Sequence, residues 1–143
     1  MATERKASVT WQGDLMSGHG TIESVTSGVV GPLEVDWANR AEDAQGKTSP
    51  EELIAAAHAA CFAMALSHGL AQAGHTPERL ETSSTITFVP GTGITKSALT
   101  VMGTVPGLDQ DGFRQAAEEA KENCPVSGAL KGNVELELDA QLA

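Results

Sequence analysis

The chain has 143 residues, a length that suits one domain able to bury its own core without metal or disulfide cross-links. Its net charge is −10, with acidic residues spread along the sequence, so nucleic acid and anionic membrane surfaces are not expected partners. Aromatic residues make up 3% of the chain and tyrosine is absent, which predicts an aliphatic core.

The N-terminal part of the chain predicts strands. The first residues, MATERKASVTW, lack the apolar stretch of a signal peptide, so a cytoplasmic protein is expected. Alternating residues predict strands over 6–12, 18–25 and 28–37, with a turn between the last two. The polar segment 38–48 is expected to be a loop.

The clearest local signal marks the start of a long helix. Ser49 is a suitable N-cap, Pro50 suits the first helical position, and Glu52 follows three residues after the cap. The helix should run to about Ala73 and end at Gly74.

This helix is expected to be buried on all sides, because its large apolar residues are distributed around its whole circumference. A continuous run of about 18 apolar residues is absent, and His58 interrupts the richest stretch, so no membrane span is predicted. A chain of this length encloses such a helix poorly, which favours a partner subunit.

The C-terminal half predicts strands at 80–90, 94–105 and 133–141. A helix capped by Asp109 and a short helix opened by Pro125 should lie between the last two strands. This order of elements indicates an α+β fold in which antiparallel strands pack on long helices, in a single domain over residues 1–143.

The chain has two cysteines, Cys61 and Cys124, and either a redox pair or two inert thiols would account for them in a reducing compartment. Burial in the helix should raise the pKa of Cys61 unless a cation offsets it. Cys124, as the expected N-cap before Pro125, faces free backbone N–H groups that favour its thiolate. These local arguments leave open which sulfur reacts first.

His58 lies three residues before Cys61, on the same helix face. A core histidine with hydrogen-bond partners is the preferred interpretation, and a partner of the thiolate is the alternative. His58 and His68 lie about 15 Å apart on one helix, so they do not share a metal ion.

The segment SPEELIAAAHAACFAMAL (49–66), followed by CPVS (124–127), resembles the two cysteine motifs of the OsmC/Ohr family. The resemblance extends over nearly the whole chain, and the AAHAACF motif resembles the OsmC branch of the family more than the Ohr branch. It implies antiparallel sheets wrapped around long central helices in an intertwined dimer.

The resemblance also implies a cysteine-based peroxidase that reduces organic hydroperoxides to alcohols without a metal or organic cofactor. Cys61 would be the peroxidatic residue and would form a sulfenic acid, and Cys124 would then form a disulfide with it for an external dithiol to reduce. The family further implies an arginine beside the thiolate and a glutamate that holds this arginine. Arg40 and Glu51 match these two residues.

Glu51 and Cys61 are ten residues apart, so a straight helix separates them by about 15 Å. Either Arg40 bridges much of this distance, or a second subunit supplies one of the groups, and we therefore predict an obligate homodimer. The alternative functions are a non-catalytic, stress-induced ligand-binding protein and a redox sensor of the same fold.

Overall fold

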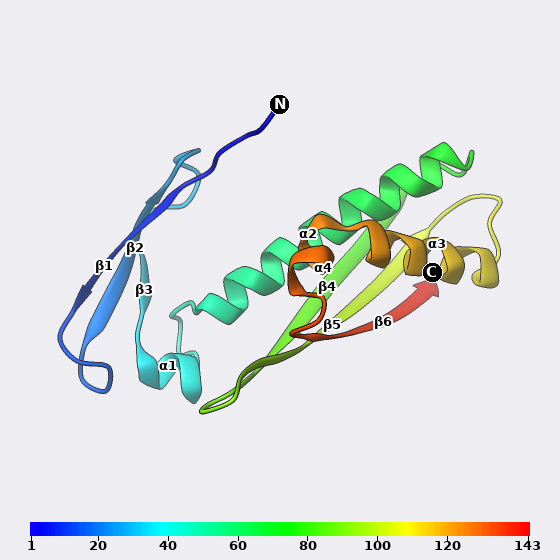
Figure 1. The fold of residues 1–143 in the computed structure, drawn as a ribbon. Helices are drawn as coiled ribbons and strands as arrows, with labels where there is room; N and C mark the ends of the chain where they lie inside the picture. Colours follow the sequence, from blue (N-terminus) through cyan, green and yellow to red (C-terminus); the bar gives the residue numbers. More distant parts are fainter. The chain divides into compact units, whose positions relative to one another are not determined.

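The computed structural model describes all 143 residues, which form two compact units, residues 1–53 and 54–143 (Figure 1). The expectation of one domain over the whole chain stays a prediction.

The first unit contains an antiparallel sheet in the order β1-β2-β3. Its strands are β1 (Ala7–Gln12), β2 (His19–Val25) and β3 (Leu33–Val35). The predicted strand at 28–37 is therefore wrong in extent, because residues 28–32 lie outside any strand.

A short helix, α1 (Trp37–Ala41), occupies part of the segment expected to be a loop. It begins there because the side chain of Asp36 caps it and accepts a hydrogen bond from the N–H of Asn39 at 2.7 Å.

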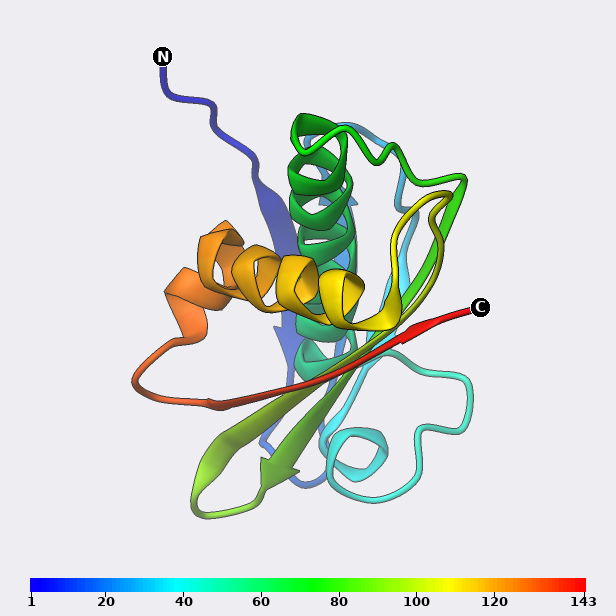
Figure 2. The ribbon, with the colours of Figure 1, turned by 90° about the vertical axis from the view of Figure 1, so that its right-hand side faces the viewer.

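The second unit contains most of the long helix α2 (Pro50–Gln72) and a sheet in the order β4-β5-β6. Its other elements are β4 (Arg79–Val89), β5 (Gly93–Thr104), α3 (Gln110–Asn123), α4 (Pro125–Leu130) and β6 (Glu135–Leu142). The predicted helices and strands of this half are confirmed within one or two residues. Figure 2 shows α3 crossing α2.

One pairing departs from the expected antiparallel arrangement. Strands β4 and β5 form an antiparallel hairpin, but β6 runs parallel to β5, with Lys96 opposite Glu135. The reason is the connection: the chain crosses over through α3 and α4 before it returns to the sheet, and such a crossover lets the returning strand run in the same direction.

The predicted helix starts are confirmed by their caps. The hydroxyl of Ser49 accepts a hydrogen bond from the N–H of Glu52 at 3.1 Å, and Asp109 Oδ1 accepts one from the N–H of Gly112 at 2.8 Å. Helix α2 stops where Gly74 takes a positive φ of 85°. These signals fix the helix that carries Cys61 and the one that leads to Cys124.

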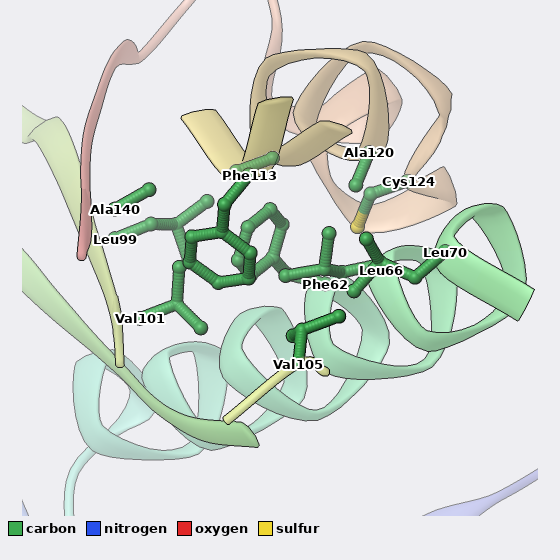
Figure 3. Packing of buried hydrophobic residues seen from close by; sticks show 11 residues of the cluster. Phe62, Leu66, Leu70, Leu99, Val101, Val105, Phe113, Ala120, Cys124 and Ala140 are labelled. Carbon is green, nitrogen blue, oxygen red and sulfur yellow. The ribbon is translucent and has the colours of Figure 1, made fainter. Parts of the chain in front are cut away.

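The core of the second unit lies between its sheet and the two longer helices. Figure 3 shows Phe62 and Leu66 of α2 packed with Phe113 of α3 against Leu99 and Val101 of β5. Leu99 and Val101 are two residues apart, so they lie on the same face of the sheet. The expectation of an aliphatic core is only partly confirmed, because the largest fully buried side chains are those of Phe62 and Phe113.

Helix α2 is not buried on all sides within this chain. Phe62 and Leu66 are fully buried, whereas Met64 is 71% exposed. By length and composition alone, α2 is long and apolar enough to cross a membrane, although no membrane span is predicted from the sequence. In the structure, 22% of its most apolar window is buried. His58 lies in this helix and its polar side chain is fully buried, which is typical of a helix that packs against other parts of a protein.

Candidate active site

The structure brings the two cysteines of the second unit together, both reduced. Cys61 comes from the middle of α2, and Cys124 lies between α3 and α4. Figure 3 shows the sulfur of Cys124 pointing toward α2, and the thiols of Cys124 and Cys61 lie close enough for each to shift the pKa of the other. Cys61 is partly exposed, whereas Cys124 is only 1% exposed.

The pKa of the Cys61 thiol is raised above its ordinary value. Burial is the largest cause, and the neighbouring thiol of Cys124 adds to it. The backbone N–H of Val126 acts in the opposite direction, and none of the groups that shift this pKa is a cation. Cys61 therefore needs a positive charge from elsewhere to react as a thiolate at neutral pH.

The pKa of Cys124 is lowered, although burial acts to raise it. The backbone N–H of Ser127, the Cys61 thiol and the Ser127 hydroxyl together outweigh the burial. Cys124 makes no regular cap hydrogen bond with the first turn of α4, so these groups act as oriented dipoles around the sulfur. The expectation that local structure favours this thiolate is confirmed.

In the first unit, Arg40 and Glu51 form a close ion pair. The guanidinium donates from Nη2 to Oε1 of Glu51 at 2.7 Å and from Nε to the same oxygen at 3.0 Å. Its carbon atom Cζ lies 6.0 Å from the centre of the Trp37 ring. Glu51 is buried and the side chain of Arg40 is 30% exposed, so the pair combines a fixed orientation with access to solvent.

His58 is fully buried and both of its ring nitrogens have partners. Nδ1 lies 2.6 Å from the hydroxyl of Ser97, and Nε2 lies 2.8 Å from that of Ser127. Burial lowers the pKa of His58, so the ring stays neutral at physiological pH. The preferred interpretation of His58 as a hydrogen-bonded core residue is confirmed.

Ser127 is the residue near the sulfurs that the sequence analysis did not single out. It lies in the CPVS segment, three residues after Cys124, where a serine side chain reaches the start of its own helix. No local sequence pattern marks Ser97 of β5 as a partner of His58, because only the packing of the sheet against α2 brings the two residues together.

The comparisons with known proteins agree on one family. The family model of OsmC-like proteins matches residues 42–139. The chain is 43% identical to Peroxiredoxin OsmC of Escherichia coli strain K12, over 99% of both chains. It is 30% identical to the organic hydroperoxide resistance protein OhrB of Bacillus subtilis strain 168, over 93% of this chain and 95% of that protein.

Solved structures resemble the fold as well. The Bacillus subtilis OhrB structure is 29% identical, with a TM-score of 0.68, and the match covers 94% of this chain and 97% of that one. An organic hydroperoxide resistance protein from Legionella pneumophila is 26% identical, with a TM-score of 0.66, over 96% and 97% of the two chains.

Proposed function

The chain belongs to the family of OsmC-like proteins and is a cysteine-based peroxidase that reduces hydroperoxides, and from this premise we propose that Cys61 and Cys124 carry the reaction. The observation that supports these two residues most directly is their contact: a partly exposed thiol on α2 touches a buried, more acidic one. Cys124 is almost fully buried and Cys61 is partly exposed, so a substrate reaches Cys61 and this residue is the first to react.

The first step converts a hydroperoxide into an alcohol. The thiolate of Cys61 attacks the outer oxygen of the O–O bond, which breaks, and the alkoxide leaves and takes up a proton. Cys61 keeps the transferred OH as a sulfenic acid. An organic hydroperoxide suits this site because Cys61 packs against the apolar core cluster.

The second step forms the Cys61–Cys124 disulfide and releases water, and an external dithiol then returns both sulfurs to thiols by exchange. The two sulfurs hold the two electrons that the peroxide consumes. The reaction therefore requires no metal, haem or flavin.

The Arg40–Glu51 pair is proposed as the source of the cation that Cys61 needs. Glu51 holds the guanidinium by two of its nitrogens, so the charge has a defined direction. A guanidinium beside a buried thiolate lowers its pKa, which opposes the effect of burial at Cys61.

A homodimer of single-domain chains in the cytoplasm is also proposed. Helix α2 carries Met64 at 71% exposure in the middle of an apolar segment, and a second copy of the chain would cover this surface. The proposed dimer also allows Arg40 of one subunit to serve Cys61 of its partner.

The proposal is tested by the consumption of cumene hydroperoxide with dithiothreitol as reductant, in the unmodified protein and in two variants. Cys61→Ser should abolish turnover. Cys124→Ser should react once and leave a sulfenic acid on Cys61 that dimedone traps. Equal loss of the first oxidation step in both variants would contradict the assigned roles, and slow turnover of the unmodified protein in excess dithiol would favour the redox sensor.

A further inference from the structure

A row of hydrogen-bonded side chains leads through the second unit to Cys124. The hydroxyl of Ser84 lies 2.9 Å from that of Ser97, which lies 2.6 Å from Nδ1 of His58. On the other side of the ring, Nε2 lies 2.8 Å from the hydroxyl of Ser127, which interacts with the sulfur of Cys124. Four elements, β4, β5, α2 and α4, contribute to this row.

The chemistry of these groups sets the direction of the row. A neutral histidine donates from one nitrogen and accepts at the other. When the Ser127 hydroxyl donates to a Cys124 thiolate, its oxygen is left to accept from Nε2–H of His58. Nδ1 then accepts from Ser97, and every hydrogen bond points toward the sulfur, an arrangement in which neighbouring bonds strengthen one another.

We propose that His58 is a positioning residue for disulfide formation: it holds the Ser127 hydroxyl as a donor to Cys124, so that Cys124 attacks the Cys61 sulfenic acid as a thiolate. This inference rests on the proposed function, and it adds a residue that acts only in the second step of the reaction, the formation of the disulfide. A lone pair of Cys124 forms the S–S bond while the S–O bond of Cys61 breaks. The leaving hydroxide and the proton that Cys124 has lost combine as water.

None of the groups that shift the pKa of Cys124 is a charged residue. Cys61 faces it from α2, and β5 contributes Ser97 to the row and apolar side chains to the core. The nearest lysines along the chain are already paired, Lys121 with Glu118 at 3.1 Å and Lys131 with Glu122 at 3.3 Å. Cys124 therefore has three kinds of polar neighbour: the N–H groups at the start of α4, the thiol of Cys61, and the row of histidine and serine side chains that ends at Ser127.

The first test separates the two chemical steps in a single turnover. Reduced protein is mixed with cumene hydroperoxide, and sulfenic acid and disulfide are followed by dimedone trapping and mass spectrometry. In Ser127→Ala and His58→Gln, sulfenic acid should form at the rate of the unmodified protein. The disulfide should form about tenfold more slowly, the change expected for one hydrogen bond to a charged group. Ser83→Ala, on the same strand as Ser84 but outside the row, is the matched control.

The pH dependence distinguishes positioning from a structural role. The slow step of both variants should recover at alkaline pH, where Cys124 ionises without help. A second readout needs no peroxide: the chain has two cysteines and no tyrosine, so in a Cys61→Ser background the ultraviolet absorbance of the thiolate reports Cys124 alone. Adding Ser127→Ala or His58→Gln should move this titration to higher pH by about one unit.

An unchanged rate of disulfide formation in Ser127→Ala, or a loss that alkaline pH does not restore, overturns the inference. Loss of sulfenic acid formation in the unmodified protein would instead contradict the proposed function. If His58→Gln does not fold, Ser127→Ala decides alone, since it removes a single hydroxyl.

Discussion

The guanidinium of Arg40 donates to the carboxylate of Glu51 from two nitrogens, with Nη2 2.7 Å and Nε 3.0 Å from Oε1. Eleven residues separate the two positions, and the pair joins the segment after β3 to the first turn of α2. Because two of its nitrogens are held, the direction of the positive charge is set before a substrate arrives.

We expect Arg40→Met to slow the oxidation of Cys61 at neutral pH by about tenfold to a thousandfold, because a nearby cation lowers the pKa of an ionisable group by roughly one to three units. Burial raises the pKa of Cys61, so without the cation the thiolate fraction increases as the pH rises. The rate of Arg40→Met should therefore approach that of the unmodified protein at alkaline pH. Rapid mixing with cumene hydroperoxide at several pH values measures this.

Lys47→Met is the matched control, since Lys47 forms an ion pair with Asp36 at 2.7 Å in the same unit. It should leave the oxidation rate within about twofold, as expected for a group with no role in the thiol pKa. An equal loss in the two variants would show that the effect belongs to the unit as a whole.

Met64→Glu should convert the proposed dimer to monomer, because a glutamate in an apolar interface loses its hydration without a partner. Light scattering coupled to size exclusion measures the mass in solution. Met16→Glu replaces a methionine of similar exposure, 73%, in the turn between β1 and β2, and should stay dimeric. A monodisperse monomer of the unmodified protein would refute the dimer.

Gly103→Ala should lower the free energy of unfolding by about 1–3 kcal/mol, the usual cost of overpacking a core. A Cβ at residue 103 would lie 2.5 Å from Cζ of the buried Phe113. Gly69→Ala is the opposite case: in the last turn of α2 its Cβ meets nothing within 4 Å, and alanine should stabilise the helix by about 0.5–1 kcal/mol. Urea denaturation at a fixed protein concentration compares the two.

Stability should fall as the pH drops below about 6.5, the ordinary pKa of histidine. Burial lowers the pKa of His58 in the folded protein, so below that pH the unfolded chain binds a proton at His58 and the folded chain does not. The loss continues, at about 1.4 kcal/mol per pH unit, until the pH reaches the folded pKa. Above the ordinary value His58 is neutral in both states and contributes no slope.

Denaturant midpoints between about pH 6.5 and 5.5 test this, a range chosen to lie above the ordinary pKa values of carboxylates. His58→Gln should flatten the fall, whereas His68→Gln, on the exposed side of the same helix, should keep it. A slope that survives in His58→Gln would assign the effect to other groups.

Much of the fold could be predicted from local patterns. The caps Ser49 and Asp109 and the Cys124-Pro125 step fix the ends of their helices, because each depends on residues within a few positions along the chain. The helix after Asp36 was missed although Asp36 is itself a good cap. Its five residues carry no apolar periodicity that would distinguish them from a loop.

The sequence by itself determined the two cysteine motifs, the long helix and the position of Cys124 as the N-cap of α4, since these depend on neighbours along the chain. Only the tertiary structure decided that Cys61 and Cys124 touch and which of them is exposed. It also decided that His58 lies between Ser97 and Ser127 and that β6 runs parallel to β5. Burial and side-chain contacts arise when segments that are distant in the sequence pack together, and local sequence patterns do not specify this packing.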